Sequence, residues 1–485
     1  MKISIRSPRK IIATLFIGLF FAGLCLQVTA RAGGGGGGHG GGGGGGGGGG
    51  FGGGGFGGGY HGGGGGGGDA SLPLIIGFIV VIIIVSAVRS ASKGTNTAAA
   101  MANQQASQPF PDGLTPDKVK NSFVSIQQAW QNKNLKEVRR WISDGIYQRY
   151  TVQFAIMNKL EQVNRLSNIR VNDIRVVGAH KDAAYEVADV AISFTIDDEF
   201  RSAKYPVFDE SFMNDSDVEY WSFIRKQASP GSPVGKDLYS NDNCPNCGAP
   251  MDIKMGEICR CSSCGTLANN ATYDWVLSEI TQQDDWGMHE QGQSDYTALY
   301  QQMQADGLFA IQRMEDVASN VFMQIMDVMT GGDAKRLTRF ADKDTVAAIL
   351  GFRNAGQSFL FDRLYLNAVT IVENKMTNGR VDINFILFAT YQKVTIGQQL
   401  RFIDKEMMEH AFSMTLSRNV SGLKANARET VFSYECPCCG APYTDTTDAT
   451  CTYCGEAVIN LNNSWVLTSF EPKAFERGDS EDDNG

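Results

Sequence analysis

This 485-residue chain has few histidines and fewer basic than acidic residues. Lys and Arg number 43 against 52 Asp and Glu, which gives a net charge of -9 at pH 7. A protein that binds nucleic acid by neutralising phosphates needs the opposite balance, so this function class is disfavoured. Only 5 histidines occur, and no His with a carboxylate or nucleophile recurs along the chain. We therefore expect no enzyme.

Glycine, by contrast, is concentrated in one block. Between Gly33 and Gly68 every residue is glycine except for His39, Phe51, Phe56, Tyr60 and His61. Such a block cannot bury enough apolar surface to offset its backbone entropy, so residues 33–68 are expected to form a disordered tether. Weak self-association or metal contacts through the scattered aromatic and histidine side chains remain the alternative.

The chain begins with the features of a signal peptide. Basic residues precede the apolar run Ile11–Leu26, and Ala30-Arg31-Ala32 offers the small residues that a signal peptidase accepts. We predict a signal peptide over residues 1–32. The alternative is an uncleaved membrane helix, because the apolar run is long for a signal core.

A second apolar run, Leu72–Val88, contains no charged residue and is long enough to cross a hydrocarbon core of about 30 Å. It predicts a transmembrane helix over residues 71–90, with a buried core helix as the alternative. Arg89 and Lys93 follow it, and basic residues stay on the cytoplasmic side. This orientation places the glycine tract outside and the rest of the chain in the cytoplasm, beginning with a linker over residues 91–113.

The cytoplasmic part contains an internal repeat. Asn121–Trp141 aligns without gaps with Asn320–Phe340, and its apolar residues have helical spacing. A short polar turn in each copy leads into a second short helix. Later segments pair as strands: Ala188–Ile196 with Gly379–Leu387, Glu219–Phe223 with Glu409–Ser413, and the closing strands at Trp275 and Trp465.

Helices followed by an antiparallel sheet predict an α+β fold in two tandem domains. We place the first domain at residues 114–281 and the second at 308–471, joined by a linker at 282–307. Residues 472–485 are an acidic tail, expected to be disordered.

The clearest chemical signal is a set of four Cys-x-x-Cys pairs, each followed by glycine. Two intervening residues let one tight turn present both sulfur atoms to one metal ion, and glycine permits the backbone that this turn needs. Two pairs lie between the last two strands of each domain, in ribbons at residues 244–265 and 436–455. The predicted ligands are Cys244, Cys247, Cys261 and Cys264 in the first domain, and Cys436, Cys439, Cys451 and Cys454 in the second.

Four thiolates fill a tetrahedral zinc ion, so we expect two structural zinc ions with no open coordination position. Disulfides and iron clusters are the alternatives. Cys259 and Cys438 are left over. Each is interpreted as a bystander, although ligand exchange or oxidation sensing are open to them.

The helical and strand segments resemble a known family. FVSIQQAW, NLKEVRRW, YWSFIRK and DWVLSEI resemble the C-terminal domain of mitochondrial import inner membrane translocase subunit 44 and its bacterial relatives. The similarity covers about residues 114–280 and, more faintly, 308–470. Together with the signal, glycine tract, span and ribbons, the chain resembles bacterial zinc-ribbon transport proteins of this family.

The resemblance implies a cone-shaped fold similar to nuclear transport factor 2, with helices over a curved antiparallel sheet. It also implies a bacterial inner-membrane location and contact with acidic lipid. The chain lacks the charged helical segment through which the mitochondrial member engages its chaperone, so the motor-tether role does not carry over. The leading hypothesis is a membrane-anchored, non-enzymatic scaffold or adaptor in protein transport or assembly, with a protein partner that the sequence does not identify.

The alternative is a carrier that binds a lipid or other apolar ligand in the cone cavity, and acid-base catalysis in that cavity is the less favoured variant of this alternative. Phe194, Trp221, Phe385 and Phe412 are candidates for lining such a cavity, although plain core is the other interpretation. His180, His289 and His410 are interpreted as surface or packing residues.

Nucleic-acid binding by the ribbons is disfavoured. The first ribbon has only Lys254 and Arg260 as basic residues. The second ribbon has no basic residue, while Glu435, Asp445 and Asp448 are acidic. Neither ribbon can therefore form a track for phosphates.

Overall fold

The computed structural model describes residues 107–473, except 228, 236, 252–258, 284, 287–295, 305, 355–358, 398, 421–435, 437–438, 440, 442–449 and 463. The described residues all fall in one compact unit. The predicted signal peptide, glycine tract and transmembrane helix lie outside them, as do Cys438, His289 and almost all of the acidic tail. Within the described part, no helix combines the length and the apolar character required to cross a membrane.

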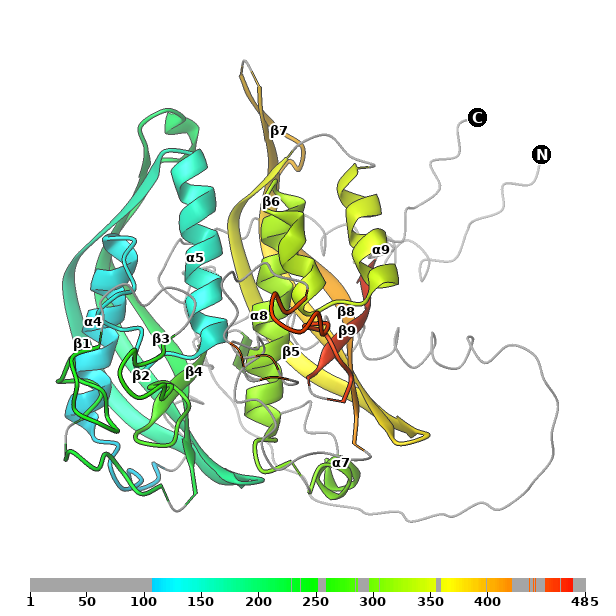
Figure 1. The fold of residues 1–485 in the computed structure, drawn as a ribbon. Helices are drawn as coiled ribbons and strands as arrows, with labels where there is room; N and C mark the ends of the chain where they lie inside the picture. Colours follow the sequence, from blue (N-terminus) through cyan, green and yellow to red (C-terminus); the bar gives the residue numbers. More distant parts are fainter. Residues whose placement is uncertain are drawn as a thin grey trace, which may run out of the picture. The chain divides into compact units, whose positions relative to one another are not determined.

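The first domain has two helices and a four-stranded antiparallel sheet (Figure 1). The strands are hydrogen-bonded in the order β1-β2-β3-β4, so each strand pairs with the next along the chain. Its elements are α4 (Pro116–Gln131), α5 (Asp144–Lys159), β1 (Gln162–Asp182), β2 (Tyr185–Ser202), the 3-10 helix η1 (Pro206–Phe208), β3 (Glu210–Lys226) and β4 (Val276–Gln282).

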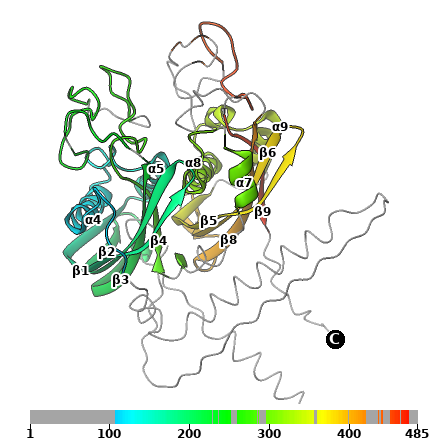
Figure 2. The same cartoon turned by 90° about the horizontal axis from the view of Figure 1, so that it is seen from below.

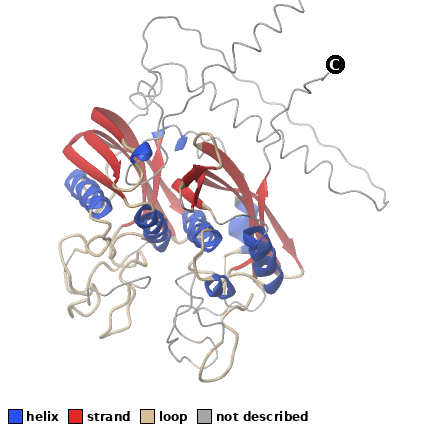
Figure 3. Ribbon diagram, turned by 90° about the horizontal axis from the view of Figure 1, so that it is seen from above, coloured by secondary structure: helices blue, strands red, loops and turns tan. Residues whose placement is uncertain are grey.

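The second domain repeats this order after a short helix, α7 (Thr297–Gln302). Its sheet has the order β5-β6-β8-β9, with β7 paired to β6. The elements are α8 (Ile311–Met329), the 3-10 helix η2 (Ala334–Arg339), α9 (Lys343–Asn354), β5 (Leu360–Thr377), β6 (Arg380–Ile396), β7 (Leu400–Phe402), β8 (Met408–Asn419) and β9 (Val466–Lys473). Figures 2 and 3 show the longer helices α4, α5, α8 and α9 in a row along one face of the two sheets. The α+β class is thus confirmed.

Local sequence explains where the first two helices begin. Thr115 caps α4 by accepting a hydrogen bond from the Lys118 amide, and Pro116 fits the first turn. Ser143 caps α5 by accepting from the Ile146 amide. The apolar face of α4 is buried on the sheet, where the Phe123 ring lies 4.7 Å from that of Phe194 and 5.7 Å from that of Trp221, centroid to centroid.

The predicted helical alignment between the domains agrees with the backbone pairing. Ile142 forms a parallel bridge with Leu277, and Ala341 forms the same bridge with Leu467 in the second domain. Ile142 and Ala341 are one residue beyond the aligned segments, at the offset that the sequence comparison gave. The closing strands at Trp275 and Trp465 also correspond, because β4 and β9 follow directly.

The predicted correspondence between the middle strands of the two domains is wrong, because the aligned residues are shifted. The β1-β2 turn leaves Tyr185 opposite Asp182, whereas the β5-β6 turn leaves Arg380 opposite Thr377. Tyr185 therefore corresponds to Arg380, and Ala188 does not correspond to Gly379. In the next strands, Trp221 pairs with Val190 just as Met414 pairs with Phe385.

It follows that His410 is not the counterpart of Tyr220. The helices keep one offset and the strands another because the connections between them differ in length in the two domains.

Three helical details also differ from the sequence prediction. The second short helix is a series of turns in the first domain and the 3-10 helix η2 in the second. The longer helices α5 and α9 follow these segments and were not predicted. The predicted linker 282–307 contains α7. The polar side chains of α5 conceal its buried character, since Gln148, Arg149 and Gln153 are all buried.

The four aromatic residues proposed to line a cavity lie in the packed core. Phe194, Trp221, Phe385 and Phe412 are at most 3% exposed and belong to one hydrophobic cluster. The Phe412 ring on β8 packs 5.0 Å from that of Phe322 on α8, much as the Trp221 ring on β3 packs on that of Phe123 in the first domain. Plain core is therefore the interpretation that their packing supports.

Candidate functional site

The structure gathers the predicted cysteines into two groups of four, each in the loop that joins the last two long strands of its domain. Within each group the four sulfur atoms lie within 4.8 Å of one another. The first loop connects β3 to β4 and the second connects β8 to β9. Each set is therefore placed to close a long connection between paired strands.

Each described Cys-x-x-Cys turn has the same backbone geometry. The Gly248 amide donates to the Cys244 carbonyl at 2.9 Å, and the Gly455 amide donates to the Cys451 carbonyl at 2.8 Å. Both glycines have φ above 70°, at 76° and 72°, which is the left-handed region that other residues rarely occupy. The glycine after the pair thus serves the turn that aims both sulfur atoms at one point.

The sulfur spacings fit a single tetrahedral ion. In the first group the Sγ atoms of Cys244 and Cys264 are 3.6 Å apart and those of Cys247 and Cys261 are 3.8 Å apart. The corresponding distances in the second group are 3.4 Å and 3.7 Å. Tetrahedral zinc with Zn–S bonds of about 2.3 Å separates its ligands by about 3.8 Å.

A disulfide would require about 2 Å between sulfur atoms, and all cysteines in the described part are free thiols. The two groups can therefore each hold a metal ion. Thiolate tetrahedra of this kind suit zinc and also iron.

The environment of the first group differs from one cysteine to the next. Cys244 and Cys261 are buried, whereas Cys247 and Cys264 are exposed. Burial raises the pKa of the Cys244 thiol to about 12. A hydrogen bond from the Thr266 side chain leads the contacts that lower the pKa of the Cys264 thiol to about 6. One ligand pair thus anchors the loop in the core while the other faces solvent.

The first ribbon is attached to the helix layer by several polar and aromatic contacts. Arg140 forms an ion pair with Asp242, two residues before Cys244, at 2.7 Å. The Tyr239 ring stacks on Trp141 at 4.9 Å, and its hydroxyl donates to the Trp275 carbonyl at 2.8 Å. These contacts tie the ribbon to the connection between α4 and α5 and to the start of β4.

Cys259 is not part of the metal group. Its side chain is 1% exposed and belongs to the hydrophobic core, and burial raises the pKa of its thiol to about 11. A buried thiol of this kind is inert, which supports the bystander interpretation.

A second candidate region is the junction between the domains, which sequence reasoning did not foresee. Helix α5 of the first domain packs against α8 of the second. The Asp316 carboxylate on α8 accepts hydrogen bonds from the Ser143 hydroxyl at 2.5 Å and the Gly145 amide at 3.1 Å. A Cβ atom added to Gly145 would lie 2.1 Å from Oδ1 of Asp316. Only glycine allows the two helices to approach this closely.

The first domain in turn caps the second. Both carboxylate oxygens of Asp182, at the end of β1, accept backbone hydrogen bonds from the start of α8, those of Ile311 and Gln312, each at 2.8 Å. The Tyr300 hydroxyl of α7 donates to the same carboxylate at 2.8 Å. An acidic side chain at a helix N-terminus satisfies free amides and the helix dipole together.

Carboxyl groups outnumber cations at this junction. Arg149 on α5 binds both oxygens of Glu279 on β4, one of them at 2.6 Å, and donates to Ser319 on α8 at 3.3 Å. Glu315 on α8 is buried, at 6% exposure. Burial, with Glu279, Asp182 and Asp189 nearby, raises the pKa of Glu315 well above its usual value, and burial raises the pKa of Asp316 to about 7.

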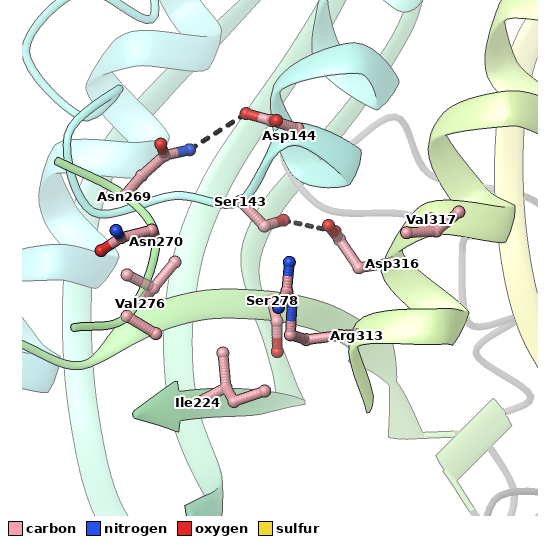
Figure 4. A pocket seen from close by; sticks show the side chains of 11 residues that line it. Ser143, Asp144, Ile224, Asn269, Asn270, Val276, Ser278, Arg313, Asp316 and Val317 are labelled. Atoms are coloured by element: carbon pink, nitrogen blue, oxygen red, sulfur yellow. Dashed lines mark hydrogen bonds between the residues drawn. The ribbon is translucent and has the colours of Figure 1, made fainter. Parts of the chain in front are cut away.

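A small cavity opens beside these groups (Figure 4). It has a volume of about 60 Å³ and is lined by residues of both domains, including Ser143, Asp144, Asn269, Ser278, Arg313 and Asp316. A second cavity between α5 and β5 is about 10 Å³. Binding pockets for organic ligands are usually about 300–1,000 Å³, so these two suit water.

The described histidines lie apart from one another. His180 is near the β1-β2 turn, as expected, with an exposed side chain 4.0 Å from Asp189. His410 stacks on Tyr391 with ring centroids 4.1 Å apart. Burial, followed by the charge of Lys393, lowers the pKa of His410 to about 4. Packing is the role that its environment supports.

Comparison with known proteins adds one family. Residues 108–234 match the family model described as the Tim44-like domain. The match covers the two helices and the first three strands of the first domain, and it ends before Cys244. No match is found among curated proteins.

One similar solved structure is titled "Ntf2 like protein involved in plasmid conjugation". It is 8% identical, and the alignment covers 74% of this chain and 93% of that chain with a TM-score of 0.17. A likeness at this level carries no structural conclusion.

Proposed function

We propose that this protein is a membrane-anchored, non-enzymatic scaffold or adaptor that acts in protein transport or membrane-associated assembly. The match of the first domain to the Tim44-like domain supports a transport-related role. The anchor and the cytoplasmic location of both domains rest on the apolar run Leu72–Val88 and the basic residues after it.

The observation that carries the proposal is the buried junction between the domains. Asp316 bonds to the start of α5, Asp182 bonds to the start of α8, and Gln162 on β1 donates to Asp362 on β5 at 2.7 Å. Two domains held in this way present their outer surfaces at one fixed spacing. Fixed spacing suits a protein that brings partners together, since it lowers the entropic cost of binding both.

The packing of the described residues bears on the apolar-ligand carrier. The aromatic residues that would line a ligand cavity are buried in the core, and the two junction cavities are too small for a lipid chain. The apolar-ligand carrier therefore gains no support from the packing.

The metal groups fit structural zinc in this scheme. Eight thiolates in two groups would hold two ions, each with four protein ligands and no position for substrate. The ions would close the β3-β4 and β8-β9 connections and so preserve the surfaces formed by these loops.

A candidate contact surface lies where the domains meet at the β7 end, named here the apolar end (Figure 1). It consists of Val207 and Met213 from the first domain and Phe402 and Ile403 from the second, which are 65%, 70%, 41% and 48% exposed. The Phe402 ring contacts that of Phe208, next to Val207, at 5.6 Å. Exposed apolar side chains near a contact between two domains are typical of contact surfaces.

Site-specific photo-crosslinking in native membranes tests the proposal with the full chain. A photoreactive residue at Met213 or Phe402 should capture a defined protein in stoichiometric yield. The matched control is Met376, which is 46% exposed on the β5 hairpin away from this surface. Lipid as the main product at the apolar end would instead favour the carrier, and equal background at all positions would contradict the adaptor.

A further inference from the structure

The junction between the domains buries a carboxyl group that accepts no hydrogen bond from the described residues. Glu315 lies in the second turn of α8 and is 6% exposed. It makes no hydrogen bond with the residues that the structure describes, unlike its neighbour Asp316. A buried carboxylate with neither hydrogen bond nor counter-ion is costly, so the group needs some form of compensation.

The charged groups around Glu315 come from every element packed against it. Burial raises its pKa, Glu279 on β4, Asp182 on β1 and Asp189 on β2 raise it further, and Arg149 on α5 lowers it. Tyr296 and Tyr300 contribute neutral phenols from the segment before α8. Arg313, two residues earlier, is held by the Tyr185 hydroxyl and the Leu308 carbonyl, each at 2.7 Å.

The available cation is already committed. Arg149 binds Glu279 through both guanidinium nitrogens and also reaches Ser319. Asp182 is compensated differently, because its oxygens accept two backbone amides and a phenol. Glu315 has neither form of compensation.

A metal ion does not fill this role either. Among the described residues, the groups that bring three or more ligand atoms within reach of one ion are the two cysteine sets. No three described carboxyl groups of the junction are therefore close enough together to share one cation.

We propose that a proton on Glu315 holds the two domains together, so that the junction loosens when this proton is lost. The neutral carboxyl removes one negative charge from a region that contains three others. Ionisation would place a fourth buried anion against α5 and β4, and the least costly relief is entry of water between α5 and α8. This inference does not depend on the transport role.

The direction of the pH dependence follows from the raised pKa values. A carboxyl group whose pKa is higher in the closed junction than in the open one stabilises closure at low pH, and this stabilisation is lost as pH rises. The loss begins near the ordinary Glu pKa of about 4.3. For Asp316 it is complete above about 7. For Glu315 the stabilisation is likewise lost as pH rises, because burial raises its pKa well above the usual value.

Hydrogen exchange of the full chain in detergent micelles measures this opening. Peptides from α5 and from the first half of α8 are followed from about pH 5 to about pH 9, with correction for intrinsic exchange. The opening constant should rise by up to about tenfold per pH unit for each proton released. Glu315→Gln cannot ionise and should flatten this rise.

The matched control is Asp344→Asn, which alters an exposed carboxyl group on α9 and should leave the profile unchanged. A Glu315→Gln profile as steep as the wild type would overturn the proposal. Infrared difference spectroscopy of the wild type is the second measurement if that variant does not fold. A protonated carboxyl band that persists at neutral pH and disappears as α5 opens is expected, and its absence would also refute the inference.

Discussion

The backbone amide of Gly145 on α5 donates to the Asp316 carboxylate on α8, at 3.1 Å between nitrogen and oxygen. A main-chain atom of one domain thus contacts a side chain of the other, with no room for a Cβ atom between them. The domains are fitted together at this position, and the fit depends on one small residue.

Gly145→Ala should therefore destabilise the junction. The new Cβ would lie 2.8 Å from the Asp316 backbone oxygen, so the helices would have to separate. Overpacking of this kind costs about 1–3 kcal/mol, measured as the free energy of unfolding in denaturant. Gly351→Ala on α9 is the control, because its Cβ would meet nothing within 4 Å. It should stabilise α9 by about 0.5–1 kcal/mol, and similar losses in both variants would argue against the close fit.

Asp182→Ala should weaken α8. Three donors lose their acceptor, and two of them are the first amides of the helix. Loss of such a cap costs about 1–2 kcal/mol. The expected signature is faster hydrogen exchange at the start of α8. Asp333→Ala, which removes the cap of the short 3-10 helix η2, is the control and should cost less, because one amide loses its acceptor. An unchanged α8 would show that the cap contributes nothing.

Metal analysis should find two zinc ions per chain, one for each cysteine group. Cys264→Ser and Cys454→Ser should each reduce the content to one ion, because a thiolate tetrahedron loses a ligand. Cys259→Ala should retain both ions, since Cys259 is outside the group. Chelation should increase hydrogen exchange first in residues 244–265 and 436–455. Iron in place of zinc would correct the metal but keep the ligand set.

His410 should make the fold less stable in acid. Its pKa in the folded state is about 4, against an ordinary value of 6.5. The unfolded chain therefore binds a proton first, and stability falls as pH decreases from about 6.5 to about 4. His410→Phe keeps the stack on Tyr391 and should remove this loss, which is at most about 3 kcal/mol. The exposed His180→Phe is the control, and equal acid profiles in the two variants would count against the assignment.

Sequence patterns predicted the fold best where the side chains serve one purpose. The helical repeat around Phe123 and Phe322 was found because both residues pack on a sheet, and the cysteine pairs were found because metal ligands need fixed spacing. Helix α5 was missed because one face packs on its own sheet and another on α8. Its buried Arg149 and Gln153 bond across the junction, so the apolar stripe that reveals a helix is interrupted.

The middle strands failed for a different reason. Bulges interrupt the pairing of β1 with β2 and of β5 with β6. The loops that precede β1 and β5 also differ in length. A gapless alignment cannot follow such changes, although both sheets keep the same order. The sequence repeat did not predict the junction, because the junction joins segments that occupy different places in the two domains.

This last feature bears on whether copies of the chain can pack end to end. Helix α8 of the second domain corresponds to α4 of the first, and α9 corresponds to α5. The contact of α5 with α8 is therefore head-to-tail packing. It would extend into a filament if α9 received α4 of another molecule. At that contact Asp117 would occupy the place of Asp316. It would meet Asp342 and Asp344, which stand where Ser143 and Gly145 stand in the first domain. Like charges and a side chain in place of glycine disfavour this contact between two copies of the chain.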